Sequence, residues 1–357
     1  ARRMSRERGR EPVAVVRPPS HATPQRPWTA LPAAFDRFSV LAVAFAALLW
    51  SSDVAFRVGL IERGLTGSQM VLGEDVLISV ALLPVYRRAW RQARCLHLRG
   101  WLAILLVAAG PQAAATVMFT QSLSISFSAG APSTTYLLQQ LQPLFAIALA
   151  GVILRERRRP VFWPLMGLSL TAVYVVVFAP DPMAPWSEIN RTRLAAAALA
   201  IGAAGLWASG TVLGRYVLRD LSFVATTTLR FVLAIPVLVV IVVVSGGVQA
   251  LTVYRAEHLP DLVGLALIPG LVALTLYYRA LRSTPASLAT VAETTYPIAV
   301  TLLLALPAPY GLGQQILVGQ IIGTAVLVAM VIALNLEKRH AVVLPTGRFS
   351  RLSAGVS

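Results

Sequence analysis

The sequence consists mainly of apolar stretches of about 20 residues, which short polar segments separate. A helix needs about 20 consecutive apolar residues to cross the hydrocarbon core of a bilayer. Of the 357 residues, 57% are hydrophobic and 13% are charged, whereas soluble domains average about 45–50% apolar and 25% charged residues. The sequence therefore predicts an all-α integral membrane protein with ten transmembrane helices, at 38–57, 67–86, 100–122, 132–154, 160–179, 194–214, 222–244, 261–281, 285–306 and 314–336.

Both ends of the chain are polar. Residues 1–36 are rich in arginine and proline, and such a segment cannot bury a core, so we expect a disordered tail. Residues 338–357 form a second polar tail. The apolar stretches between the tails divide into one set over 37–180 and another over 190–337.

The basic residues lie mostly in alternate loops. The segments "RRAWRQARCLHLR" (87–99) and "RERRR" (155–159) are strongly basic, as are both tails, whereas the intervening loops carry few arginines. Short basic loops stay on the cytoplasmic side of a membrane. The pattern predicts an inner-membrane protein with an even number of spans and both termini in the cytoplasm.

Several functional classes lack support in the sequence. The net charge of +16 comes without a nucleic-acid-reading motif, so we expect no nucleic-acid partner. Cys95 is the single cysteine and the histidines fall in expected tails or loops, which argues against a disulfide, a metal site or a haem. No Walker or HExxH motif is present, so we predict no catalytic residues, no cofactor and no direct use of ATP.

The second half of the chain repeats features of the first half. "LLWSSDVAFR" resembles "GLWASGTVLGR", "QQLQPLFAIAL" resembles "ETTYPIAVTLL", and "AGPQAAATVMFTQSL" resembles "IPGLVALTLYYRAL". Each half then holds five spans, and because five is odd, the halves enter the membrane from opposite sides. Inverted repeats of this kind are common in secondary transporters, which hold substrate near the midplane between the repeats.

These segments, together with "LLQQLQPLFAIALAGVILRER", "TLRFVLAIPVL" and "YYRALRSTPASLATVAETTYPI", resemble the two EamA repeats of the drug/metabolite transporter superfamily over about residues 38–336. The resemblance implies a ten-helix inner-membrane carrier that exports amino acids or other metabolites by alternating access.

The chain departs from the family pattern at two places. The acidic ending after the fourth helix of a repeat is present in "LRER" at Glu156, but the second copy reads "ALPAPYG" without an acid. An arginine early in the second helix of a repeat is present at Arg230, whereas Glu74 occupies the matching place in the first repeat. These departures leave the role of single motif residues open.

Three charged residues within the expected spans, Glu74, Arg230 and Glu293, are candidates for a substrate or proton site. A charge at the membrane centre costs about 2.5–3.5 kcal/mol, so it is kept with a partner, a cavity or a function. Glu74 and Arg230 hold equivalent places and could face each other, either as a structural ion pair or as a binding site. We expect the neighbouring Asp75 to lie nearer the surface or on another helix face, because adjacent helix residues point about 100° apart.

Amides and prolines recur together in the expected fourth and ninth spans. Gln139 lies four residues before Pro143 and Glu293 lies four before Pro297, while Gln142 shares a helix face with Gln139. A proline frees a backbone carbonyl, which a membrane tolerates next to a cavity, water or a neighbouring helix. We expect these amides to line a hydrated interior or to join helices, and the candidate hinges are Pro111, Pro143, Pro269 and Pro297.

Trp50 and Trp207 match between the repeats and are candidates for stacking on a substrate or for packing. The function that we predict is therefore a secondary transporter for a small metabolite, an amino acid or a drug-like compound, with protons as a possible coupling ion. A channel or a receptor without transport activity is the alternative, and an intramembrane enzyme is a weaker one. The oligomeric state stays open.

Overall fold

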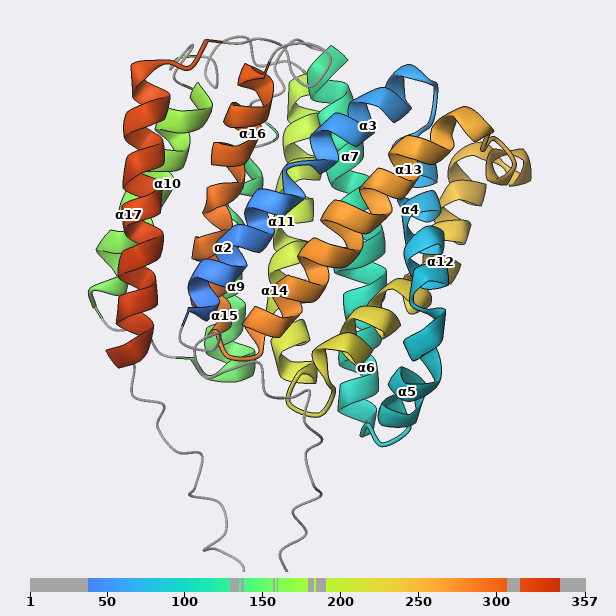
Figure 1. Cartoon of the computed structure of the whole chain (residues 1–357), viewed down its shortest axis with the longest axis horizontal. Helices are drawn as coiled ribbons and strands as arrows, with labels where there is room; N and C mark the ends of the chain where they lie inside the picture. The colour runs from blue at the N-terminus through green and yellow to red at the C-terminus, as the bar shows by residue number, and fades with distance from the viewer. Residues whose placement is uncertain are drawn as a thin grey trace, which may run out of the picture.

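The structure of the protein is a computed structural model, which describes residues 38–128, 135, 138–156, 158, 160–178, 183, 191–306 and 315–340. The predicted tail at 1–36 lies outside the described residues, as does 341–357. Within the described ranges the chain is helical and has no strand (Figure 1).

The α-helices are, in chain order, α2 (Ser39–Trp50), α3 (Asp53–Glu62), α4 (Gly67–Ala81), α5 (Leu83–Ala93), α6 (Leu98–Val107), α7 (Ala115–Ser128), α9 (Gln142–Leu149), α10 (Phe162–Phe178), α11 (Arg191–Val217), α12 (Phe223–Gly246), α13 (Leu259–Leu265), α14 (Leu274–Leu281), α15 (Ala286–Ala292), α16 (Tyr296–Ala305) and α17 (Val318–His340). Short π- or 3₁₀-helical turns join or extend them: η2 (Ala108–Ala114), η3 (Ala150–Leu154), η4 (Val248–Leu251), η5 (Ala256–His258), η6 (Ala266–Ala273) and η7 (Glu293–Thr295). The helix α17 continues to His340, three residues into the tail predicted from 338.

Within the part of the chain that the structure describes, five continuous helical segments are long and apolar enough to cross a membrane, and six are if the bent pair α4–α5 is one span. They are Ser39–Glu62, Leu98–Ser126, Arg191–Val217, Phe223–Gly246 and Ala256–Leu281. Shorter apolar helices occupy Gln142–Leu154, Phe162–Phe178 and Val318–Met330. The chain is thus a multi-pass membrane protein, while the count of ten crossings stays a prediction.

Prolines mark breaks in the predicted spans 67–86 and 285–306. The stretch predicted at 67–86 ends as α4 at Ala81, and α5 leaves it at an angle of 88° with Pro84 in its first turn. The stretch predicted at 285–306 divides into α15, the 3₁₀ turn η7 and α16, with Pro297 in the first turn of α16. A proline lacks a backbone N–H and is tolerated in the first turn of a helix, so each helix restarts there.

Two further prolines lie inside π-helical turns. Pro111 is within η2, between α6 and α7, and Pro269 is within η6, between α13 and α14. A π-helical turn lets a helix continue past a residue that disturbs its regular hydrogen bonds. Neighbouring backbones come close at η2, because a Cβ added at Gly210 of α11 would lie 2.6 Å from the ring of Pro111.

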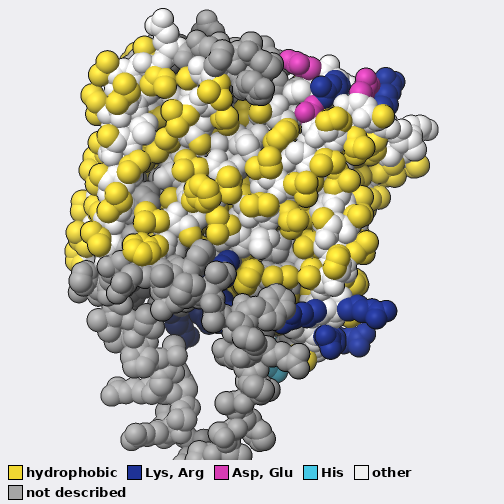
Figure 2. Space-filling view, in the orientation of Figure 1, with side chains coloured by type: hydrophobic (Ala, Val, Ile, Leu, Met, Phe, Trp, Pro, Cys, Tyr) yellow, Lys and Arg dark blue, Asp and Glu magenta, His cyan; other side chains and the backbone are white. Residues whose placement is uncertain are grey.

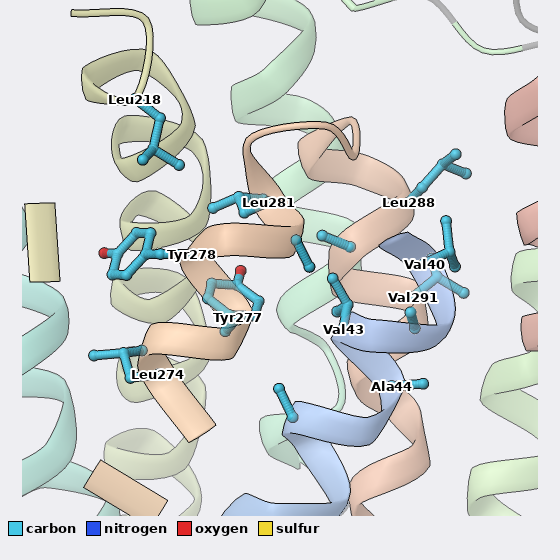
Figure 3. Packing of buried hydrophobic residues seen from close by; sticks show 14 of the residues in the cluster. Val40, Val43, Ala44, Leu218, Leu274, Tyr277, Tyr278, Leu281, Leu288 and Val291 are labelled. Atoms are coloured by element: carbon cyan, nitrogen blue, oxygen red, sulfur yellow. The ribbon is translucent and has the colours of Figure 1, made fainter. Parts of the chain in front are cut away.

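The buried core connects the two halves of the chain. Val40, Val43 and Ala44 of α2 pack in one hydrophobic cluster with residues of α14 and α15, which include Leu281 and Leu288 (Figure 3). The helix α11 buries alanines along its length at positions 196, 200, 203, 204 and 208. Small side chains let this helix pass through the centre of the bundle, close to α7 and α9.

Hydrophobic side chains cover much of the visible outer surface, and charged residues lie toward its two ends (Figure 2). The start of α2, the end of α17 and the helix α5 lie at the same end of the molecule (Figure 1). This distribution of apolar and charged surface is the one that a bilayer requires of a spanning protein.

Candidate functional site

A cavity of about 140 Å³ lies among helices of both halves of the chain. Its walls combine ionisable groups, amides and aromatic rings. The lining residues are Trp50, Asp53, Arg57, Glu74, Gln112, Thr116, Phe119, Gln139, Gln142, Trp207, Thr211, Arg230, Phe231, Pro269, Gly270, Leu274, Tyr277, Glu293 and Tyr296.

Arg57 balances two carboxylates on one wall of the cavity. Its Nε lies 3.1 Å from Oδ2 of Asp53, one turn earlier in α3, and its Nη2 lies 3.1 Å from Oε2 of Glu74 in α4. The Arg57 side chain is 4% exposed. Tyr296 of α16 also donates its hydroxyl to Asp53, over 3.4 Å. These contacts join α3 and α4 to α16 from the second half.

Arg230 of α12 enters the cavity from the opposite half and has neutral partners. Its Nε donates to Oε1 of Gln112 over 2.6 Å, and its Nη1 donates to the hydroxyl of Tyr278 over 2.9 Å. Gln112 in turn donates its amide to Oδ1 of Asp75 over 2.8 Å. Gln112 therefore links Arg230 to Asp75, and Arg230 has no direct ion pair among the described residues.

Glu293 is held by neutral donors. Gln142 donates to Oε2 of Glu293 over 2.6 Å, and the Tyr277 hydroxyl donates to Oε1 over 2.8 Å. Because Tyr277 has one hydroxyl proton, Thr211, whose Oγ1 lies 2.8 Å from that hydroxyl, is its donor. Within the part of the chain that the structure describes, Glu293 has two neutral donors and no ion pair.

Two pairs of packed aromatic rings flank these polar residues. The rings of Trp50 and Tyr277 have centroids 5.0 Å apart, and those of Phe119 and Trp207 are 5.1 Å apart. The indole N–H of Trp207 donates to the carbonyl of Pro111 over 3.0 Å. This bond satisfies a carbonyl within the π-helical turn, and it anchors the first half of the chain to α11.

The seven predicted binding residues all line this cavity: Trp50, Glu74, Gln139, Gln142, Trp207, Arg230 and Glu293. Glu74 and Arg230 share the cavity, but the salt bridge of Glu74 is to Arg57. Of the proposed hinges, Pro269 lines the cavity, whereas Pro111, Pro143 and Pro297 lie in adjoining turns. No ligand-competent cluster of His, Cys, Asp or Glu for a metal ion occurs among the described residues.

The position of Asp75 contradicts one of the two expectations for this residue. It is not near the surface but fully buried, and it faces Gln112 and not the cavity that Glu74 lines. The alternative expectation, another helix face, is therefore the one that the geometry supports. One Asp75 oxygen, Oδ2, has no hydrogen-bond partner among the described residues, and the same holds for Oε1 of Gln139.

The polar residues of the site that the sequence did not indicate include Arg57, Gln112 and Tyr277. Arg57 is the last residue of the span predicted at 38–57, but the helical segment continues to Glu62, and the buried Arg57 side chain lines the cavity. The available signal was its spacing of four residues from Asp53, which places both on one helix face. Gln112 follows the proposed hinge Pro111 directly, and Tyr277 lies near the end of the span predicted at 261–281.

A second polar cluster lies outside the cavity, at the N-terminus of α15. Glu156 accepts hydrogen bonds from the backbone of Ala286 over 3.0 Å and from the Ser287 hydroxyl over 2.7 Å. Arg158 and Arg215 form ion pairs with it at 2.7 and 3.4 Å. Burial raises the pKa of Glu156, but the Ser287 hydrogen bond and the Arg158 charge outweigh burial and leave the pKa below its usual value.

The chain is similar to known proteins in sequence and in structure. The family model of the EamA-like transporter family matches residues 194–336. The "Riboflavin transporter ImpX" of Fusobacterium nucleatum is 32% identical over 164 residues, which are 45% of this chain and 54% of that protein. The similar region thus spans about half the length of this curated relative.

The third similarity is to a protein of solved crystal structure. It superposes with a TM-score of 0.64 at 16% sequence identity, over 85% of this chain and 97% of the other. At this identity the superposition speaks for a shared fold alone.

Proposed function

We propose, from the premise that residues 194–336 belong to the EamA-like transporter family, that this chain is an inner-membrane secondary transporter exporting a small organic metabolite through the central cavity. The observation that carries the proposal is the cavity itself, in which ionisable groups of both halves meet inside an apolar bundle. A membrane protein keeps charges at this depth where they serve a pathway.

The proposed architecture is a pair of inverted five-helix repeats. In its support, the prolines that align in the sequence have matching structural settings. Pro111 and Pro269 each lie inside a π-helical turn, and Pro143 and Pro297 each lie in the first turn of a helix that follows a break. Irregular backbone next to a cavity is the usual location of the substrate site in repeat transporters. Alternating access then requires the repeats to rock about this site.

The polarity of the cavity favours a solute with hydrogen-bonding groups at both ends. Arg230 can receive a carboxylate or carbonyl, Glu293 can receive an ammonium or N–H group, and Trp50 offers an aromatic face. Drug-sized ligands fill pockets of about 300–1,000 Å³, so the present volume of about 140 Å³ suits a compact metabolite such as an amino acid. Riboflavin, which the relative's name specifies, requires the cavity to widen.

Glu293 is the carboxylate that we propose to carry the coupling proton. Its two neutral donors can hold it both ionised and protonated, since a protonated carboxyl still accepts hydrogen bonds. Glu74 differs, because protonation would leave the buried Arg57 with one fewer partner charge. Solute binding and proton release at Glu293 would then compete for the same group.

The test is transport in liposomes that contain the purified full chain and an imposed pH gradient. The solutes are amino acids, nucleosides, riboflavin and cationic dyes. We expect saturable uptake that the gradient accelerates, and we expect Glu293→Gln to lose the pH dependence while solute exchange without a gradient continues. Glu74→Gln is the matched control and should keep its response to pH.

Flux that does not saturate would contradict the carrier proposal in favour of a channel. Uptake by Glu293→Gln with full pH dependence would contradict the proposal that Glu293 carries the coupling proton. It would not contradict the proposal that the chain is a transporter.

A further inference from the structure

The short helix α5 lies across the end of the bundle. It leaves α4 at 88°, so that it runs along the membrane plane if α4 crosses the membrane upright. Pro84 lies in its first turn, and the backbone N–H of Val85 bonds to the carbonyl of Leu82 at the corner, over 3.0 Å. The local sequence around Pro84 therefore favours the bend between α4 and α5.

One face of α5 is fixed against the bundle. Ala89 and Ala93 are buried in a cluster with residues of α6, α11 and α12, and Trp90 packs at its edge. The side-chain carbonyl of Gln92 accepts the backbone N–H of Ser222 over 2.9 Å at the start of α12. The other face of α5 consequently keeps a constant direction.

That other face is basic. Arg87, Arg88, Arg91 and Arg94 are exposed at spacings of three and four residues, and Arg99 is exposed at the start of α6. The sequence has no acidic residue between Asp75 and Glu156. The neighbouring α11–α12 turn contributes one exposed residue of each sign, Arg219 and Asp220. Figure 2 shows dark blue side chains gathered at this end of the molecule, below the hydrophobic surface.

Apolar and aromatic groups accompany the arginines. Leu83 is 63% exposed and Leu98 is 75% exposed, at the two ends of the segment. Tyr86 stacks on Trp90 with a centroid distance of 6.2 Å. Helices with a basic face, apolar residues and aromatic rings lie in the membrane interface, where the apolar groups enter the acyl chains and the basic groups meet the headgroups.

We propose that the exposed face of α5 is a binding surface for the headgroups of anionic phospholipids. Arginine forms paired hydrogen bonds with phosphate, and a basic residue near an anionic surface strengthens binding roughly fivefold. The surface is charge-complementary to that partner, and the bend places it at the depth of the headgroups. Lipid binding there would hold the end of α4, the helix that carries Glu74 to the cavity.

Cys95 provides a reporter for the experiment. It is the single cysteine of the chain, it is exposed, and it lies two residues after α5. A donor fluorophore is attached to Cys95 of the full-length protein, which is placed in vesicles. A trace of acceptor fluorophore is carried on the acyl chains of either phosphatidylglycerol or phosphatidylcholine. Energy transfer then reports which lipid gathers beside α5.

We expect wild type to transfer more energy to phosphatidylglycerol than to phosphatidylcholine, with the preference falling as salt rises from about 50 to 500 mM. Arg87→Gln together with Arg91→Gln should lower the preference at least about fivefold. Arg87→Lys with Arg91→Lys should retain most of it, which separates charge from packing. Arg255→Gln with Arg282→Gln removes equal charge from exposed positions outside α5 and should leave it unchanged.

Equal transfer to both lipids in the wild type, or an undiminished preference in the glutamine variant, would overturn the proposal. A preference that the two control substitutions also abolish would overturn it as well, because the effect would then follow net charge and not α5.

Discussion

Arg57 supplies the positive charge for two buried carboxylates in the cavity wall. Asp53 and Glu74 each approach it to 3.1 Å, and Thr120 lies beside its other terminal nitrogen at 3.5 Å. A buried ion pair has a small net effect on stability while it is intact, but the removal of one partner leaves an uncompensated charge.

Arg57→Gln should therefore destabilise the protein strongly. The loss of one partner from a buried pair costs about 3–5 kcal/mol, and here two carboxylates lose their cation. Adding Glu74→Gln to Arg57→Gln should restore part of the stability, since it removes one of the two stranded charges. The measurement is the apparent melting temperature of each variant in detergent, with Glu257→Gln, an exposed acid, as the control. Additive losses in the double variant would contradict the coupling.

The sequence identified charged residues of the site better than it identified their partners. Glu74, Arg230 and Glu293 could be singled out because an ionisable group inside an apolar stretch is costly. Their partners depend on how far each helix extends and how it is rotated, as the unexpected position of Arg57 illustrates. Tyr277 gave no signal, because a tyrosine in an apolar segment is equally typical of packing and of the membrane interface.

At the level of elements, the cluster around Glu156 joins the end of η3 to three other parts of the chain. Glu156 contacts the first turn of α15 and the end of α11. Arg215 also donates to the carbonyl of Leu281, the last residue of α14, and to that of Thr284. Arg155, immediately before Glu156, has a φ of 56°, a left-handed conformation that a non-glycine residue rarely adopts. The chain therefore holds Glu156 in a constrained turn.

Glu156→Gln should lower stability in a pH-dependent way. A carboxylate whose pKa is lowered by folding stabilises the protein above its unfolded pKa, near the ordinary value of 4.5, and loses this effect as the pH falls through the folded pKa. Hydrogen bonds to a charged group contribute about 1.5–3 kcal/mol. Melting temperatures of wild type and variant should thus differ above about pH 5 and converge in stronger acid.

Glu257→Gln, at an exposed acid, serves as the matched control for this series. Its melting temperature should stay close to that of wild type throughout. A gap between wild type and Glu156→Gln that stays constant over the whole pH range would mean that Glu156 acts through its shape and not through its charge.

Helices were easier to predict from the sequence than their interruptions. The apolar stretches of about 20 residues indicate the long helices correctly, such as the segment Phe223–Gly246 predicted at 222–244. The bend after Ala81 and the division at Glu293–Thr295 could not be placed, because a proline can end, kink or restart a helix. Tertiary neighbours decide among these outcomes, for example when Trp207 bonds to the carbonyl of Pro111.

For the whole molecule, the distribution of charge and the course of the chain point to one orientation. The start of α2 and the end of α17 lie at one end together with the basic helix α5, whereas the α12–α13 connection lies toward the opposite end (Figure 1). Arginines on the cytoplasmic side would place both termini and Cys95 in the cytoplasm. An inverted repeat of two five-helix units requires this arrangement, because an even number of crossings returns the chain to its starting side.

The orientation predicts the accessibility of single cysteines to a membrane-impermeant thiol reagent. The native Cys95 is exposed in the α5–α6 connection and should react only after the membrane is permeabilised. With Cys95→Ser as background, Arg255→Cys places a thiol in the α12–α13 connection, at a position where the native side chain is 78% exposed. This thiol should react in intact cells, and the background protein should not react at all. The reverse pattern would invert the orientation. Labelling of both positions from outside would contradict the odd number of crossings, five, that the inverted repeat places between Cys95 and position 255.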